Sequence, residues 1–208
     1  MPVLIDADDR RRHIVDAALR LVLTGGLAAA NFRKVAAEAG LNIGSVRHYF
    51  ADHESLIVAV ATEVGDRMGR RLTRHPAPGE GDREAAKHHL RAVVEELVPL
   101  DDERHREAIV LMEVIAASRI TPAFEPVVRQ MASDLHQVLA EGLAAAGVAD
   151  PTREAIRLAA LISGLSLDAV TPHGAIDRTT IRAVLDQHIA DVTTRRIRLG
   201  RLPVRGGW

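Results

Sequence analysis

The chain has 208 residues, of which 47% are hydrophobic, and this suits one mid-sized domain or a small domain joined to a larger one. It contains no cysteine, so a disulfide scaffold and cysteine-based zinc or redox chemistry are excluded. The net charge of −1 is unevenly spread: residues 1–74 carry +2, residues 75–191 carry −8 and residues 192–208 carry +5, which fits either nucleic-acid contact at one end or ordinary solvated faces.

The first predicted element is a helix from Asp9 to Thr24. Ala, Leu and Arg, which are strong helix formers, are abundant along the whole chain. Within this segment apolar residues recur at helical spacing, and the pair Gly25-Gly26 ends the helix. The face that should turn inward comprises Ile14, Ala18, Leu21 and Val22.

Two short helices joined by a tight turn are predicted next. Asn31 can cap the first of them, which covers about residues 32–39. Gly40 ends that helix, because the position just after a helix is commonly left-handed and favours glycine. The second covers about residues 43–49, so the pair forms a candidate helix-turn-helix.

A long helix and then an all-helical body follow. Asp52 should cap the long helix, which runs to about Leu72, and the segment HPAPGEG at residues 75–81 is the best domain boundary. Further helices are expected at about residues 82–98, 102–119, 122–146, 151–171 and 177–197, with Thr121, Asp150 and Asp177 as helix starters. No segment alternates in the manner of a strand, so the sequence predicts an all-α protein of about nine helices.

The second short helix has the character of a DNA recognition helix. A helix that enters the major groove must be slim and must offer hydrogen-bond donors. Gly44 keeps its leading end slim, Arg47 and His48 supply donors, and Val46 and Phe50 should point inward as anchors. A helical hairpin without any role in DNA binding is the alternative. The expected DNA-contacting residues are Arg33, Lys34, Asn42, Ile43, Gly44, Ser45, Arg47, His48, Tyr49 and His53.

Three successive runs, NFRKVAAEAG, LNIGSVRHYF and ADHESLIVAV, give residues 10–60 a resemblance to the DNA-binding domain of the tetracycline-repressor (TetR) family. The resemblance implies that the first three helices bind DNA. Two positions depart from the family pattern: Arg47 stands where the family usually has Tyr, and His53 where it often has Lys. Arginine can bind a phosphate by a charge-assisted bond or read guanine bidentately.

The C-terminal half, with the run LAALISGLSLDAVTPHGAIDRTTIRAVLDQHI at residues 158–189, resembles the BetI-like branch of the same family. The resemblance implies that the last two long helices pair with a second subunit as a four-helix bundle, and that an effector sits among the helices before them. Ser163 stands where the branch usually has Asp. The expected dimer-interface residues are Leu158, Leu161, Leu165, Val184, Leu185 and Ile189.

The effector is expected to be mostly apolar with one or two hydrogen-bonding groups, and not choline or a similar quaternary ammonium ion. Such cations are held over several aromatic rings. The chain has only one Trp, one Tyr and three Phe, and Phe124 is the single aromatic residue of the sensor region. The expected ligand-binding residues, which plain core packing explains as well, are Met112, Glu113, Ile115, Arg119, Phe124, Met131, Leu135, His136 and Ser163.

No enzymatic motif is found in the chain. It lacks a G-x-S-x-G turn, a glycine-rich phosphate loop and HExxH, and its histidines, including His88, His89 and His105, are best explained as surface residues. No catalytic residue, metal or cofactor is therefore expected. The N-terminus does not have the pattern of a signal peptide and the apolar runs are too short to cross a bilayer, so we expect a soluble cytoplasmic protein without membrane contact.

The expected organisation is a helix-turn-helix domain at residues 1–52, a connecting helix at 53–74, an effector-binding and dimerisation domain at 75–198 and an irregular basic tail at 199–208. Its expected partners are double-stranded DNA, a small-molecule effector and a second copy of the chain. Two functions remain open: a ligand-responsive repressor, or a helical ligand-binding or enzyme-like protein that has lost specific operator recognition.

Overall fold

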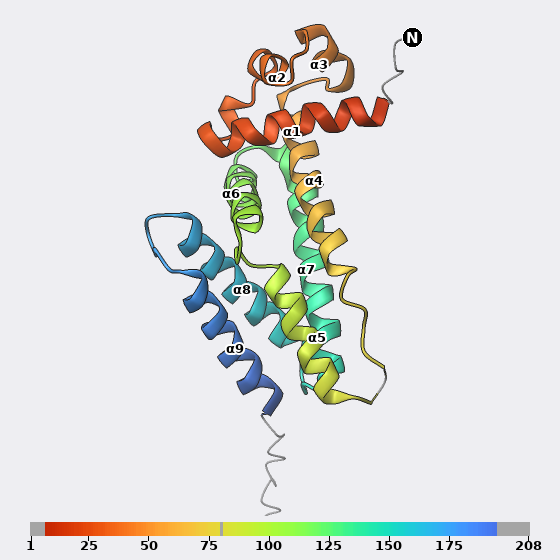
Figure 1. Ribbon diagram of the computed structural model, residues 1–208, viewed down its shortest axis with the longest axis vertical. Helices are drawn as coiled ribbons and strands as arrows, with labels where there is room; N and C mark the ends of the chain where they lie inside the picture. The colour runs from red at the N-terminus through yellow and green to blue at the C-terminus, as the bar shows by residue number, and fades with distance from the viewer. Residues whose placement is uncertain (1–6, 80, 195–208) are drawn as a thin grey trace, which may run out of the picture.

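The computed structural model describes residues 7–79 and 81–194, and this part of the chain consists of α-helices and two short 3-10 helices with no strand (Figure 1). The all-α class expected from the sequence is therefore confirmed. In chain order the elements are α1 (Ala7–Gly25), η1 (Leu27–Ala29), α2 (Phe32–Glu38), α3 (Ile43–Tyr49), α4 (His53–Leu72), α5 (Arg83–Glu96), α6 (Asp102–Ala117), η2 (Pro122–Phe124), α7 (Glu125–Ala145), α8 (Pro151–Val170) and α9 (Arg178–Thr194).

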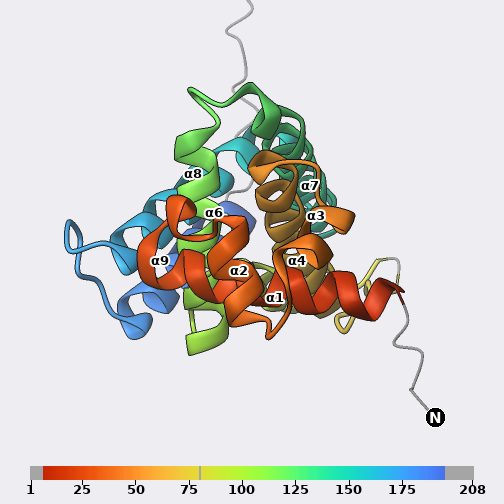
Figure 2. The same ribbon diagram turned by 90° about the horizontal axis from the view of Figure 1, so that it is seen from above.

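A small head, made of α1 to α3, covers one end of the elongated molecule (Figures 1 and 2). The side chain of Asn31 accepts a hydrogen bond from the backbone N–H of Lys34 and so caps α2, and Asn42 caps α3 in the same way through Ser45. Gly40 between them has φ +64°, a left-handed conformation that a residue with a side chain rarely adopts. These local signals build the helix-turn-helix that the sequence predicted.

The hydrophobic core of the head continues into the body. It is formed by the inward faces of α1 to α4, and it also includes Val110 and Val114 of α6 and Phe124 of η2, which are at most 3% exposed. Because α6 contributes side chains to the same core, the head is held against the body by packing and not by α4 alone.

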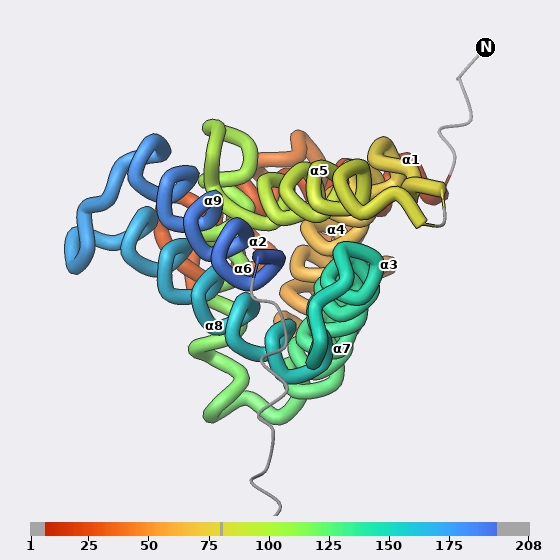
Figure 3. The backbone as a smooth tube through the Cα atoms, turned by 90° about the horizontal axis from the view of Figure 1, so that it is seen from below, coloured from red at the N-terminus to blue at the C-terminus, as the bar shows by residue number. Residues whose placement is uncertain are grey.

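A second hydrophobic core fills the far end of the molecule, where α5, α7, α8 and α9 pack together (Figure 3). Its largest fully buried side chains are Leu90, Leu139, Leu143, Leu158, Ile181 and Leu185. The two cores are joined by α4 and α7, the two long helices that run along the molecule (Figure 1). Packed helices therefore connect the head with the far end without a break.

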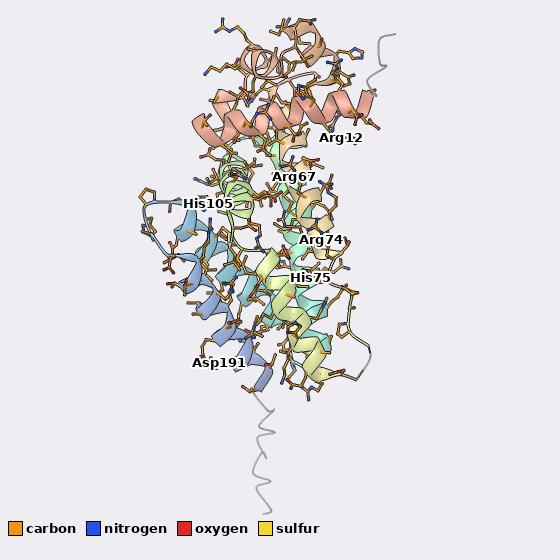
Figure 4. The ribbon with its side chains drawn as sticks, in the orientation of Figure 1. Arg12, Arg67, Arg74, His75, His105 and Asp191 are labelled. Carbon is orange, nitrogen blue, oxygen red and sulfur yellow. The ribbon has the colours of Figure 1, made fainter. Side chains whose placement is uncertain are left out.

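Ion pairs of the α4 arginines tie this helix to its neighbours. Figure 4 labels one of these arginines, Arg67. Arg71 donates to both carboxylate oxygens of Glu107 on α6, at 3.0 and 2.6 Å, and lies 3.3 Å from Glu96 on α5. One turn earlier, Arg67 pairs with Asp16 of α1 at 2.5 Å and with Glu63 at 2.8 Å. Glu107 is only 4% exposed, so its charge depends on Arg71 for compensation.

The element boundaries agree with the sequence within a few residues, with three differences. The two 3-10 helices were not predicted, and η2 occupies the first turn of the helix expected at 122–146. Asp150 and Asp177 start helices as expected, but the side chain of Thr121 makes no capping hydrogen bond. The expected end of the last helix and the basic tail lie outside the described residues. Within the described ranges, no helix is long and apolar enough to cross a membrane.

Candidate nucleic-acid interface

Helix α3 presents one polar face outward and is fixed by two buried anchors. Val46 is fully buried and Phe50 is 3% exposed, and both belong to the core of the head, as the sequence predicted. On the opposite side Gly44, Arg47 and His48 are exposed. A short helix held rigidly from behind, with donors on its free face, is the arrangement that reading base edges requires.

Three cations of the head are free to meet phosphate or base edges. The side chains of Arg33 and Lys34 on α2 and of Arg47 on α3 are exposed. Within residues 7–79 and 81–194, no hydrogen bond or ion pair engages these three side chains. An unpaired surface cation costs little by itself, and it gains a charge-assisted hydrogen bond when a phosphate approaches.

A groove of about 490 Å³ lies beside α3. Asn42, Gly44, Ser45, His48 and Tyr49 line it from the helix-turn-helix, and Arg10 lines it from the start of α1. The His48 and Tyr49 rings meet edge to face, with their centroids 5.1 Å apart, so each restricts the other. Arg10 was not expected at this site. The only signal for it in the sequence is the run of three arginines at positions 10–12.

Two of the expected DNA-contacting residues also hold the head together. The side-chain oxygen of Asn42 accepts hydrogen bonds from the backbone N–H and the hydroxyl of Ser45, at 2.8 and 3.2 Å, which leaves its amide N–H groups as donors. His53 is half-buried, and its Nε2 donates to the carbonyl oxygen of Leu27 at 3.0 Å. This bond ties α4 to η1, so His53 has a structural task whether or not a phosphate lies beside it.

Asp52 fixes the start of α4 next to this surface. Its side chain accepts a hydrogen bond from the backbone N–H of Ser55 at 2.7 Å, and the Ser55 hydroxyl is 3.3 Å from the Asp52 backbone N–H, which completes a capping box. The hydrogen bonds from Ser55 hold the pKa of the Asp52 carboxyl below its usual range. The carboxylate therefore stays charged and keeps its capping role at neutral pH.

The expected ligand-binding residues are divided among different surroundings. Phe124 is buried in the core of the head, Met131 packs against that core, and Leu135 packs against the second core. The carboxylate of Glu113 lies near Gly26, where it would be 3.5 Å from a Cβ placed on that glycine. The remaining residues are the half-buried Met112 and the exposed Ile115, Arg119, His136 and Ser163. As a set, these residues remain a prediction.

The expected dimer-interface residues differ in how far they are buried within one protomer, and as an interface they remain a prediction. Four of the six residues are already buried inside one protomer, in the second core, and so do not need a second subunit to cover them. They are Leu158, Leu165, Leu185 and Ile189, with exposures of 0%, 9%, 2% and 4%. Leu161 packs partly against the same core, and Val184 is 37% exposed. The large apolar side chains that α8 and α9 expose are Ile156, Leu167 and Val184.

The histidines of α5 and α6 do not form a metal centre. Across the described ranges no group of three or more His, Asp or Glu side chains is placed to hold a metal ion. Burial lowers the pKa of His89, and the neighbouring His75 lowers it further. The Nε2 atom of His75 lies 3.1 Å from the Glu96 carboxylate at the end of α5, so this ring is in hydrogen-bond contact with the carboxylate that also faces Arg71.

Comparison with known proteins covers both halves of the chain. Residues 14–60 match the family described as bacterial regulatory proteins, tetR family, and residues 86–194 match the BetI-type transcriptional repressor C-terminal family. The HTH-type transcriptional regulator PksA of Bacillus subtilis is 30% identical over 200 residues, which cover 92% of this chain and 94% of PksA.

Two solved structures extend the comparison. The multidrug binding protein EbrR, complexed with malachite green, is 30% identical with a TM-score of 0.65, and the match covers 86% of this chain and 98% of EbrR. A transcriptional regulator from Saccharomonospora viridis in complex with choline has a TM-score of 0.78. It is 20% identical, with 88% of this chain and 96% of the other covered, and therefore shares the fold alone.

Proposed function

Since the chain belongs to the TetR family of transcriptional regulators and has a BetI-type C-terminal domain, we propose that it is a repressor that a small molecule releases from a palindromic operator. Members of this family are DNA-binding regulators and not enzymes. The observation that carries the proposal is the exposed Arg47, which no other described residue engages. It lies on a recognition helix whose inner side is fixed by the buried Val46 and Phe50. Arg33 and Lys34 add two phosphate contacts from α2.

The proposal requires a homodimer. One recognition helix reads only a few base pairs, so two copies on two half-sites are needed for useful affinity. The exposed apolar side chains of α8 and α9 supply a surface for pairing, together with a shallow groove of about 460 Å³ on α9 that is lined by Thr179, Thr180, Ala183, Val184 and Gln187. A two-fold pairing makes the interface isologous, and the operator should then be roughly palindromic.

DNA selection tests the proposal and identifies the operator in the same experiment. The purified protein is used to select duplexes from a randomised pool, and the enriched sequence is compared with the region upstream of the gene in a gel-shift assay. We expect an enriched palindrome and a discrete shift that unrelated DNA does not compete away. Absence of any sequence preference would leave a helical ligand-binding protein that has lost operator recognition.

The effector belongs to a different chemical class from choline. A quaternary ammonium ion is held by several aromatic faces, but Phe32, Tyr49 and Phe50 lie in the head, and Phe124 is 3% exposed inside the first core. We propose a mostly apolar effector with one or two hydrogen-bonding groups, such as an acid that pairs with the exposed Arg119 in the turn after α6.

Calorimetric titration decides the negative part of this proposal. We expect neither choline nor betaine aldehyde to give binding heat or to release the protein from its selected operator. Saturable binding of either compound, accompanied by release from the operator, would show that a cation site forms in spite of the missing aromatic residues.

A further inference from the structure

The groove between α3 and the start of α1 has no assigned role. We propose that it holds a phosphate of the DNA backbone and that Arg10 is the residue that binds it. The proposal rests on the DNA-binding function proposed above and adds a contact from outside the helix-turn-helix.

The residues that line the groove are suited to an anion. Arg10 contributes a guanidinium group, His48 and Tyr49 contribute ring N–H and hydroxyl donors, and no carboxylate is among the lining residues. Because the Asn42 oxygen is occupied by Ser45, the free end of that side chain offers donors only. A groove with donors on both walls and a cation at its edge favours a phosphate over a neutral or cationic ligand.

Arg10 differs from the two arginines that follow it. The guanidinium of Arg11 lies 5.2 Å from the centroid of the Phe50 ring, and Arg12 forms an ion pair with Asp9. Arg10 is half-buried, and no hydrogen bond or ion pair engages it in the described part of the chain. The pairing of Asp9 with Arg12 leaves that carboxylate committed elsewhere. A partly desolvated cation without a counterion is stabilised when an anion arrives.

The position of the groove explains why the anion is a backbone phosphate. An α-helix with its side chains is about 10–12 Å across, and the major groove is about 12 Å wide, so a recognition helix fills it. Groups at the side of that helix then meet the phosphates that form the wall. The first turns of α1 lie in the same head as α3 (Figures 1 and 2), and Arg10 lines the groove beside α3 from there. This position would set Arg10 against such a wall.

The test measures binding by fluorescence anisotropy across a series of salt concentrations. Two duplexes are used, the selected operator and an unrelated sequence of the same length. For Arg10→Ala we expect about tenfold to a hundredfold weaker binding to both duplexes, and a salt slope smaller by about one unit. Arg10→Lys keeps the charge and should keep the slope. Arg11→Ala is the matched control, because it removes the same charge one residue away and should leave the slope unchanged.

The outcomes separate this inference from the proposed function. Two results would overturn the Arg10 contact without affecting the proposed function. One is a wild-type salt slope in folded Arg10→Ala and Arg10→Gln variants. The other is a loss of affinity and slope in Arg11→Ala as large as in Arg10→Ala. If the wild-type protein binds the two duplexes equally well, the proposed function is contradicted. The change in salt slope on either duplex still tests the Arg10 contact. A loss confined to the operator would assign Arg10 to base reading and would overturn the phosphate contact. Thermal melts by circular dichroism check that each variant is folded.

Discussion

We expect sequence specificity to depend most on Arg47. It is exposed on the free face of α3, where side chains reach base edges. If Arg47 reads a guanine, Arg47→Ala should cost about 1–3 kcal/mol of binding free energy and relax specificity at one position. A phosphate contact would instead weaken all sequences equally. Competition with single-base operator variants distinguishes these results.

The control for Arg47 is Arg129→Ala, which removes an exposed arginine of α7, outside the head. This variant should bind as the wild type does. The recognition-helix assignment is wrong if Arg47→Ala also binds its operator as tightly as the wild type does.

The pair of Arg71 and Glu107 is the most deeply buried ion pair among the described residues, with side-chain exposures of 11% and 4%. Arg71→Met leaves the Glu107 carboxylate without its partner, and we expect the free energy of unfolding to fall by about 3–5 kcal/mol. The double variant Arg71→Met/Glu107→Leu should recover most of this loss, because neither charge remains. Urea denaturation measures both. Equal stability of the single and double variants would show that Glu96 and the solvent already compensate for the missing charge.

Arg67 gives the molecule a predictable acid sensitivity. Burial alone would raise the pKa of Glu63, but hydrogen bonds from Arg67 and Arg70 outweigh it and hold the pKa below the usual 4.5. A carboxyl group with a lowered pKa in the folded state contributes stability above its unfolded pKa, and this contribution is lost as the pH falls through the folded value. We therefore expect the wild type to lose stability below about pH 4.5 more steeply than Arg67→Gln. Parallel stability curves for the two proteins would contradict this role.

At the scale of elements, the helices themselves were predictable because their signals are local. Asparagine and aspartate caps, a left-handed glycine and apolar spacing act within a few residues, and they placed α2, α3 and the start of α4 correctly. The surface against which each helix face packs is not determined by neighbouring residues in the sequence. The spacing of Leu158 and Leu185 showed an apolar face, but it does not say whether that face meets the same chain or a partner. The structure shows that they meet the same chain.

Two adjacent residues of α9 test this distinction. Val184 is 37% exposed and Leu185 is 2% exposed in the second core. Val184→Glu should convert the dimer into a folded monomer, because the charge enters only the subunit interface. Leu185→Glu buries a charge within the protomer and should unfold it. Sedimentation velocity measures dissociation of the dimer, and circular dichroism measures unfolding. A stable dimer of the Val184→Glu variant would show that the interface lies on another surface.

At the scale of the whole molecule, the way the helices pack into two cores separates the site residues that the sequence alone could predict from those it could not. The expected DNA-contacting residues lie on two consecutive short helices, the turn between them and the first residue of α4, so they are neighbours in the sequence. Arg10 was missed because α1 meets α3 only through the tertiary fold. The expected effector residues come from α6 and the turn after it, η2, α7 and α8. Of these elements, α6 and η2 contribute to the core of the head, α8 to the second core and α7 to both, and helical spacing alone does not determine how they pack.

We expect the shared core to carry a change in the body to the head. Val110 and Val114 of α6 are at most 1% exposed and pack in the core of the head, so a displacement of α6 is felt there. We expect Val114→Ala to weaken packing at this junction and lower the free energy of unfolding by about 1–2 kcal/mol, as the loss of buried methyl groups does. Thermal unfolding measures the change. An unchanged melting temperature would show that the head and α6 are not held by this contact.

Hydroxyl-radical footprinting of the selected operator tests the central claim most directly, namely that a dimer reads DNA through α3. The wild-type protein should protect two symmetric half-sites whose centres lie about 34–36 Å apart, one helical turn, or a multiple of it. Under the same conditions Arg47→Ala should lose protection at the matching position in both half-sites. A single asymmetric footprint, or protection with no sequence register, would contradict the account.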